Sequence, residues 1–256
     1  MNLNLGIMQG RLLPMQKGRY QSHPLNWEKE FELCSMHGFN SIEWIIDKNS
    51  YNSNPFFTEL GRTEIFKQIK KYNIKVDSIC CDILMEEYCN FYLDFEKWAD
   101  LLINLIEISS LMKVKVFVIP LIEKMSLRNK ILYKLVVNKL NELTGYFEEK
   151  QIKIALELDL PPIQAKELLN KLNPEVIGIN YDTGNSASLG FDVQEEFLNY
   201  GERIFDIHIK DRNLNGGPCL LGTGNANLVE VVKLIKDFKF AGPIIMQAFR
   251  DIDGLK

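Results

Sequence analysis

Short apolar runs alternate with longer segments of helical pattern along the whole chain, and this alternation restricts the fold more than any other feature. The runs are brief and most are rich in Val, Ile or Phe, which is typical of buried β-strands. There are eight of them: Leu3–Met8, Ser41–Ile46, Lys75–Cys80, Val114–Pro120, Lys153–Leu158, Val176–Tyr181, Ile204–Ile209 and Pro243–Ala248. Eight parallel strands are the number that closes a barrel. The sequence therefore predicts an α/β fold, a single (β/α)8 TIM barrel domain over residues 1–256.

The segments between these runs have the composition of outer helices. They are Trp27–His37, Thr63–Tyr72, Asp94–Met112, Ser126–Lys150, Ile163–Leu172, Asp192–Tyr200 and Asn227–Phe238. Three begin with a residue that favours a helix N-cap, namely Thr63, Ser126 and Asp192. The sequence contains no Pro/Ser-rich linker and no block of charge, so one continuous barrel is expected.

Composition narrows the class of partner. Of the 256 residues, 46% are hydrophobic and 25% are charged, which is ordinary for a globular protein with a substantial core. The formal net charge is −4, and no basic stripe is present, so we expect a small-molecule partner and no nucleic acid. No signal-peptide pattern and no apolar run of roughly 18 residues occurs, which predicts a cytoplasmic protein without a membrane partner. The five cysteines form no Cys-x-x-Cys pair, which indicates free thiols.

Four of the runs in the second half end in a side chain that can bind a cation. These side chains are Glu157, Asp182, His208 and Gln247. The runs recur at the spacing of a strand-helix unit, so their ends should meet at one end of a parallel barrel. Two carboxylates, an imidazole and an amide oxygen arranged in this way suggest a divalent-cation site.

Alternation within the strands predicts which side chains enter the barrel. In the seventh run the apolar residues are Phe205, Ile207 and Ile209, and we expect them to face the helices. Its polar residues, Asp206, His208 and Lys210, then face the lumen.

The same parity puts Glu157 and Asp182 in the lumen and adds Glu43 from the second run. Each of these residues also has a structural explanation. Asp182 could cap a turn through Thr183-Gly184-Asn185, Glu157 could pair with Lys210 or Arg212, and His208 could be a core histidine. However, collecting several buried polar groups without an ion to offset their desolvation is costly, which favours the metal site.

The order of these residues resembles the xylose-isomerase-like barrel superfamily, specifically its sugar and sugar phosphate isomerase/epimerase branch. The resemblance is carried by Glu157, Asp182-Thr-Gly-Asn185, Ile207–Asp211, the loop Gly222-Thr-Gly-Asn225 and the opening Gly6–Leu12. It implies a divalent ion (Mn, Mg, Co or Zn) and a sugar or sugar phosphate substrate whose proton moves next to the carbonyl, as in carbohydrate metabolism. It also implies a possible homo-oligomer. A nuclease of the same superfamily would need more histidines than the three in this chain.

The fourth metal position departs from the family pattern, because Gln247 stands where relatives have glutamate. An amide oxygen can bind a cation but cannot take a proton from carbon, which argues against epimerisation by two carboxylates at these positions. One interpretation is a one-base isomerisation in which Glu157 moves the proton and Lys210 stabilises the developing charge. The alternatives are a hydride shift, a metal-dependent polyol dehydratase, and a catalytically weakened sugar-binding member.

Residues around the strand ends are candidates for substrate binding. Lys210 and Arg212 lie just beyond His208, where binding loops begin in such barrels, and could hold a phosphate or carboxylate. They could equally form salt bridges with Asp206 and Asp211. Further expected substrate contacts, at or near the ends of the first two strands, are Gln9, Arg11 and Glu43.

Overall fold

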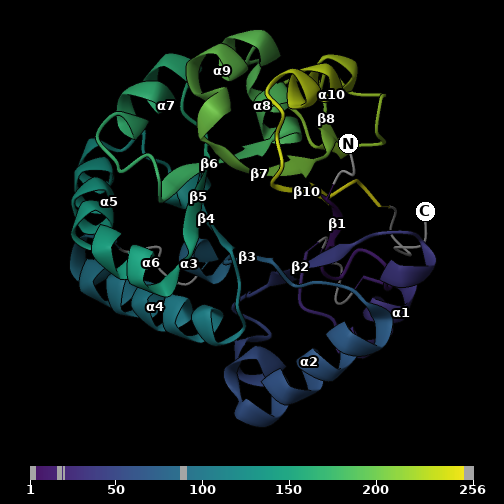
Figure 1. Ribbon diagram of the computed structural model, residues 1–256. Helices are drawn as coiled ribbons and strands as arrows, with labels where there is room; N and C mark the ends of the chain where they lie inside the picture. The colour runs from purple at the N-terminus through teal and green to yellow at the C-terminus, as the bar shows by residue number, and fades with distance from the viewer. Residues whose placement is uncertain (1–3, 16–18, 20, 87–90, 251–256) are drawn as a thin grey trace.

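Eight parallel strands close into a barrel in the computed structural model, which describes residues 4–15, 19, 21–86 and 91–250 (Figure 1). The strands are β1 (Asn4–Met8), β2 (Ser41–Ile45), β3 (Ser78–Cys80), β4 (Val116–Leu121), β5 (Lys153–Leu158), β6 (Ile177–Asp182), β7 (Ile204–Ile209) and β10 (Pro243–Met246). Their order around the barrel is β1-β10-β7-β6-β5-β4-β3-β2. The predicted TIM barrel is confirmed, although Leu3 of the first predicted strand lies outside the described residues.

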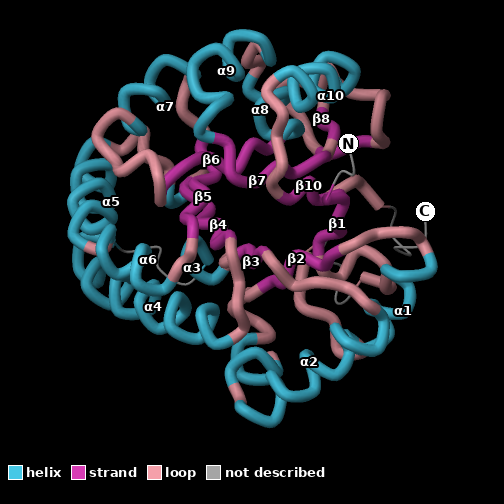
Figure 2. The backbone as a smooth tube through the Cα atoms, in the orientation of Figure 1, coloured by secondary structure: helices cyan, strands magenta, loops and turns pink. Residues whose placement is uncertain are grey.

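Helices surround the ring of strands, as the cyan and magenta segments of Figure 2 show. They are α1 (Trp27–Met36), α2 (Glu59–Tyr72), α3 (Ile83–Glu86), α4 (Phe91–Leu111), α5 (Lys130–Glu142), α6 (Thr144–Lys150), α7 (Pro162–Leu169), α8 (Thr183–Leu189), α9 (Val193–Tyr200) and α10 (Leu228–Asp237). Beyond β7, a short antiparallel pair, β8 (Asp211–Arg212) and β9 (Pro218–Cys219), is outside the barrel sheet. Four 3-10 turns occur at Tyr51–Ser53, Pro55–Phe57, Glu123–Met125 and Gly201–Arg203.

Hydrogen bonds from backbone N–H groups to side chains show which residues cap the helices. Asp192 caps α9 as predicted, since its side chain accepts from the backbone of Glu195. The other two predicted caps are wrong. Helix α2 is capped by Thr58, and α5 by Asn129, whose side chain accepts from two backbone N–H groups. The single predicted helix Ser126–Lys150 is divided at Leu143 into α5 and α6.

Two hydrophobic clusters hold the barrel together. The larger one lies between the strands and the helices and includes Trp44, Trp98, Phe117 and Phe147. The smaller one consists of side chains on the inward parity of the strands: Met8, Ile45, Cys80, Val116, Val118, Ala155 and Ile245. The interior is thus a packed core, as in other TIM barrels, and the polar side chains of the lumen rest on it.

An irregularity in the pairing of β6 with β7 changes the orientation of one predicted residue. Ile179 pairs with Ile204 and the next residue, Asn180, pairs with Asp206, so Phe205 has no opposite residue. Phe205 packs against the inner cluster rather than the helices, and space for its ring is left by Gly178. The expectation that Phe205 faces the helices is wrong because a bulge shifts the local alternation. Ile207 does belong to the outer cluster.

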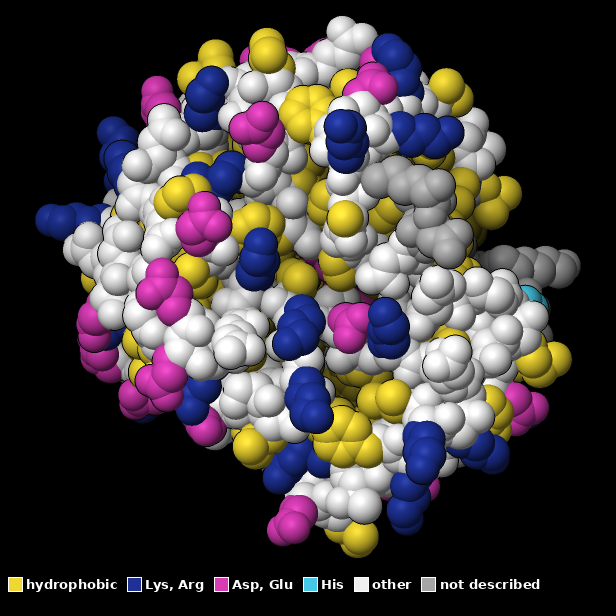
Figure 3. Space-filling view, in the orientation of Figure 1, with side chains coloured by type: hydrophobic (Ala, Val, Ile, Leu, Met, Phe, Trp, Pro, Cys, Tyr) yellow, Lys and Arg dark blue, Asp and Glu magenta, His cyan; other side chains and the backbone are white. Residues whose placement is uncertain are grey.

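Charged side chains of both signs lie on the surface of the molecule (Figure 3). On the face shown in Figure 3, several Lys and Arg side chains gather near the centre of the view beside an acidic one, and further acidic and basic side chains are scattered around the periphery. Among the described helices, none combines the length and the apolar character that crossing a bilayer requires. The described cysteines, Cys34, Cys80, Cys81 and Cys219, are free thiols, while Cys89 lies outside the described residues.

Candidate metal centre

Three side chains from the ends of β5, β6 and β7 converge inside the barrel. One potential ligand atom from each of Glu157, Asp182 and His208 lies within 4.8 Å of the others. All three residues are buried, with at most 6% of their surface exposed. Residues up to 51 positions apart in the chain therefore meet at one point because parallel strands bring their carboxyl ends together.

Asp182 is fixed from two sides. Its Oδ1 accepts from the backbone N–H groups of Gly184, at 3.0 Å, and Asn185, at 2.8 Å, and so caps α8. Its Oδ2 lies 2.6 Å from Nζ of Lys210. Burial opposes ionisation of Asp182, but Lys210 and His208 outweigh it and lower the pKa of this carboxyl. The cap that the sequence suggested as an alternative is therefore present, and it leaves Oδ2 directed at the charged cluster.

Glu157 ends a chain of hydrogen bonds. Its Oε1 accepts from the Asn185 side-chain amide, whose Oδ1 accepts from Nη1 of Arg212 at 2.8 Å. Arg212 also donates from Nε and Nη2 to the carbonyl of Gly216. Burial, together with the nearby Asp182, raises the pKa of Glu157 to about 7. Arg212 thus acts on Glu157 through Asn185 and forms neither of the salt bridges suggested by the sequence alternatives.

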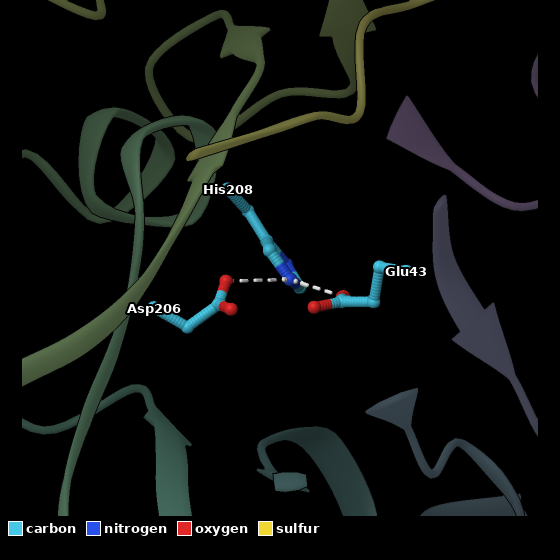
Figure 4. A group of neighbouring side chains, drawn as sticks. All are labelled: Glu43, Asp206 and His208. Atoms are coloured by element: carbon cyan, nitrogen blue, oxygen red, sulfur yellow. Dashed lines mark hydrogen bonds and ion pairs between the residues drawn. The ribbon is translucent and has the colours of Figure 1, made fainter. Parts of the chain in front are cut away.

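His208 is held by two carboxylates, Glu43 from across the barrel and Asp206 from its own strand (Figure 4). Its Nε2 lies 2.7 Å from Oε1 of Glu43 on β2 and 3.6 Å from Oδ1 of Asp206. Although burial opposes the charged imidazolium, Glu43 and Asp206 outweigh it and raise the pKa of His208 to about 10. On the other side of the ring, Nδ1 lies 3.9 Å from Oδ2 of Asp182 and 3.1 Å from the side-chain nitrogen of Asn180. Glu43 is the kind of partner that orients a metal-binding imidazole.

A second group of potential ligands shares His208. Glu43 and Asp206, neither of which is exposed to solvent, have ligand atoms within 4.8 Å of each other and of the ring. Burial and the neighbouring Glu43 carboxylate raise the pKa of Asp206 well above its usual range. Because β7 and β2 are three strands apart around the barrel, Asp206 can approach Glu43 only through the lumen. The lumen orientation of Asp206, His208 and Glu43 therefore agrees with the parity of the sequence.

A cavity of about 240 Å³ adjoins the cluster of Glu157, Asp182 and His208. Three cationic, two anionic and two amide side chains line it, together with apolar residues. The polar lining residues are Arg11, Lys210, Arg212, Glu157, Asp82, Gln21 and Gln247. Gln9 and Glu43, which we expected to touch substrate, are not in this lining. Gln9 is fully buried, and its Oε1 accepts from the backbone of Ile45.

Gln247, which directly follows β10, also lines this cavity. Its Nε2 donates to Oε1 of Gln21 at 2.6 Å, and Nε2 of Gln21 donates to Oδ2 of Asp82 at 2.9 Å. Arg11 donates to the same Gln21 oxygen, at 3.2 Å, and to the carbonyl of Ala248, at 3.0 Å. Burial, with the neighbouring Arg250, lowers the pKa of Arg11 to about 10.

The donor set fits a divalent cation. Glu157 and Asp182 supply hard oxygens and His208 supplies a nitrogen, a combination used for Mn and Zn and, through its oxygens, for Mg. Oε1 of Gln247 is buried and has no hydrogen-bond partner among the described residues, which leaves it available as a fourth ligand. Lys210 occupies Oδ2 of Asp182, so an ion that binds this oxygen has to displace an ammonium group.

Several residues of the site were missed by reasoning from the sequence. Asn185 lies in a segment that we used as a turn and as a family motif without assigning its side chain a role, Gln21 lies in a loop without a pattern, and Asp82 follows the third strand by two residues. The position of Asp82 just after a strand was the only available signal, because no periodicity extends into these loops.

Comparison with known proteins agrees with this geometry. The family described as xylose isomerase-like TIM barrel matches residues 31–255. An uncharacterized protein, MJ1311, of Methanocaldococcus jannaschii is 27% identical over 128 residues, which are 46% of this chain and 44% of that protein. The chain thus matches less than half the length of this curated relative.

Solved structures with the same fold include metal-binding and sugar-converting proteins. The IOLI protein with a bound zinc atom superposes with a TM-score of 0.74 at 19% identity, covering 97% of this chain and 90% of that one. D-psicose 3-epimerase with D-tagatose, from Clostridium cellulolyticum H10, gives 0.70 at 12% identity, covering 95% and 84%. The 3-keto-D-glucoside 4-epimerase YcjR of E. coli gives 0.70 at 15% identity, covering 99% and 95%. At these identities the likeness shows the fold.

Proposed function

Because the chain belongs to the xylose isomerase-like TIM barrel family, we propose that it is a divalent-metal-dependent isomerase or epimerase of a sugar or sugar phosphate. The observation that carries this proposal is the convergence of Glu157, Asp182 and His208 beside a cavity lined by cations, carboxylates and amides. Sugar epimerases among the structures that share the fold support the substrate class.

The candidate ligands are Glu157, Asp182, His208 and the side-chain oxygen of Gln247. When bound, a divalent cation would stabilise the negative charge that develops on the oxygens of an open-chain sugar. Manganese, magnesium, cobalt and zinc are all compatible with this donor set.

Glu157 is the candidate base. Its carboxylate lines the cavity, and a carboxyl group in such a position can accept and release a proton, as proton transfer to and from a carbon requires. Asn185 holds the carboxylate through a hydrogen bond, and Arg212 holds Asn185. The ammonium group of Lys210 supplies positive charge beside the substrate oxygens.

The cationic lining favours a ligand with many oxygens. Lys210 and Arg11 both line the cavity, and either could bind a phosphate or carboxylate of the substrate. The amides of Gln21 and Gln247 could hydrogen-bond sugar hydroxyls. D-tagatose and other ketohexoses, with their phosphates, are therefore the substrates to test first.

A catalytically weakened sugar-binding protein is the second candidate, and Gln247 favours it. This amide donates to Gln21 and has no titratable group, so it cannot move a proton. Replacing Gln247 with Glu discriminates the two. A gain in epimer formation would indicate a weakened site, whereas loss of an existing activity would indicate that glutamine is part of the mechanism.

The test of the proposed function is metal content joined to turnover. Protein purified without chelator is analysed for metals and assayed with ketohexoses and ketose phosphates in the presence of Mn²⁺. We expect about one ion per chain, and we expect Asp182→Ala and His208→Ala to lose both the ion and turnover. Asp192→Ala, which removes a helix cap outside the cavity, is the matched control and should retain both. Full turnover in a metal-free protein would contradict the proposal.

A further inference from the structure

Asp82 is a second carboxylate of the cavity. Among the described residues that line it, only Glu157 and Asp82 carry a carboxylate. Asp82 follows β3 and is partly exposed, and its described partners are a neutral amide and a thiol. Oδ2 accepts from Nε2 of Gln21 at 2.9 Å, and Oδ1 accepts from Sγ of Cys80 at 3.3 Å. The carboxylate is therefore oriented without being neutralised by a contacting cation.

The two carboxylates belong to different hydrogen-bonded chains. One chain runs from Glu157 through Asn185 to Arg212. The other runs from Asp82 through Gln21 to Gln247. Asp82 is thus connected to the wall of the cavity that contains Gln247, while Glu157 is connected to the wall that contains Arg212.

Inverting a carbon centre next to a carbonyl requires two proton-transfer groups. The proton leaves from one face of the carbon and a proton arrives on the other face, and one fixed carboxylate reaches only one face. Glu157 can serve one face. Gln247 cannot serve the other, because an amide does not titrate in the useful range.

We propose that Asp82 is the second proton-transfer residue of this cavity and acts on the face of the substrate carbon opposite to Glu157. This inference rests on the proposed function and adds epimerisation to the reactions that the site can perform. One carboxylate takes the proton, and the C–H bonding pair moves toward the carbonyl to give an enolate. The other group, as a carboxylic acid, returns a proton to the same carbon as the pair moves back. Exchange with water resets the two groups, so no oxidant or reductant is consumed.

The charges around Asp82 are compatible with this role. Burial, with smaller effects of the nearby Glu86 and Asp47, raises the pKa of Asp82 to about 6. Arg11, which bonds to the same Gln21 side chain, and Glu157 also interact electrostatically with Asp82. Both protonation states of Asp82 are therefore available close to neutral pH, which suits a group that alternately accepts and donates a proton.

The experiment compares epimer formation with solvent exchange in Asp82→Asn. Each epimer of a converted ketose pair is incubated in D₂O with Mn²⁺, and deuterium at the reacting carbon is followed by NMR. We expect epimer formation to fall by about 100-fold or more, the range typical of a lost acid-base group. One epimer should still exchange its proton, through Glu157, while the other should not. Mn²⁺ affinity should be unchanged, and formate should restore part of the epimer formation in Asp82→Ala.

The control is Asp159→Asn, which alters a carboxylate near the end of β5 that contacts Ser126 and Arg128 rather than the cavity. It should behave like the wild type. Wild-type rates in Asp82→Asn, or equal loss of exchange from both epimers without rescue by formate, would overturn the role of Asp82 and leave the proposed function standing. A wild-type protein that neither exchanges nor converts any ketose of the panel would overturn the proposed function, and with it this inference.

Discussion

The two walls of the cavity are built from different chemistry. On the wall formed by β5, β6 and β7, charged groups contact one another directly, as in the pair Asp182–Lys210. On the wall formed by β10 and the loop after β1, Gln247 and Gln21 interact through neutral amides. The first wall concentrates fixed charge, which suits an ion. The second offers neutral donors and acceptors, which suit a polyhydroxylated molecule.

The largest effect is expected from replacing Glu157, the candidate base on the wall formed by β5, β6 and β7. We expect Glu157→Gln to lower kcat by about 10²- to 10⁴-fold, because the amide cannot accept a proton. Steady-state kinetics with a ketose substrate measure the loss. Glu123→Gln, which changes an exposed carboxylate after β4, is the control and should retain wild-type kcat. An active Glu157→Gln variant would assign the proton transfer elsewhere.

The wall formed by β10 and the loop after β1 depends on a buried carboxyl group, that of Glu30. Glu30 on α1 accepts from the backbone N–H groups of Gly10 and Leu12, on either side of Arg11. Burial raises the pKa of Glu30 to about 7, so the folded protein holds this proton more tightly than the unfolded chain does. The associated stability is fully present below the unfolded pKa, near 4.5, and is lost as the pH rises through about 7.

Glu30→Gln should therefore match the wild type near pH 4.5 and exceed it at pH 8 by up to about 3 kcal/mol in the free energy of unfolding. Urea titrations across this pH range measure the difference. Glu32→Gln on the surface of the same helix should leave the pH dependence unchanged. A variant that is less stable than the wild type at pH 8 would show that the ionised carboxylate stabilises the loop.

A smaller effect is expected from replacing Glu43, the carboxylate partner of the His208 imidazole. Glu43→Gln removes the carboxylate that orients His208, and loss of such a partner typically weakens metal binding by about 10- to 100-fold. Calorimetric titration with Mn²⁺ checks the prediction. Glu30→Gln, which alters an equally buried carboxyl group outside the lumen, should not change the affinity. Unchanged Mn²⁺ binding in Glu43→Gln would indicate that His208 is not a ligand of the ion.

The smallest effect is expected from replacing Gln21, on the wall formed by β10 and the loop after β1. Gln21→Ala removes the hydrogen bonds that Gln21 shares with Asp82 and Gln247, and one such bond corresponds to about 1 kcal/mol, or roughly fivefold in KM. Mn²⁺ affinity should change less than in Glu43→Gln. Steady-state kinetics and Mn²⁺ titration of the same variant measure the two effects, on KM and on Mn²⁺ affinity, separately. Equal loss of Mn²⁺ binding in both variants would mean that the two walls do not differ in function.

Strand periodicity explains what the sequence could predict. Glu157, Asp182 and His208 lie at strand ends, where alternation and the parallel arrangement fix the direction of each side chain. The barrel and the convergence of these three residues followed from that pattern alone. Phe205 was misplaced because a bulge inserts one residue into β7, and hydrophobic alternation contains no signal for such an insertion.

Strand periodicity could not predict the residues of the site that lie outside the strands. Gln21 and Asp82 meet through chain reversals that bring segments 61 residues apart into contact, and no period describes such reversals. Asn185 was read as part of a turn, since seven-residue α8 is too short for a helical pattern to be recognised. Thr63 and Ser126 were chosen as caps because their residue type fits. The competing residues Thr58 and Asn129 fit equally well, and only the path of the chain decides between them.

The ammonium group of Lys210 beside Asp182 gives the barrel an internal counter-ion. Like-charge repulsion among the acidic side chains is thereby reduced whether or not a metal is supplied, so chelation need not unfold the protein. An ion that bound Oδ2 of Asp182 would have to replace this ammonium group, and Lys210 would then be free to contact a substrate in the cavity that it lines. Metal binding and the release of Lys210 would then be coupled.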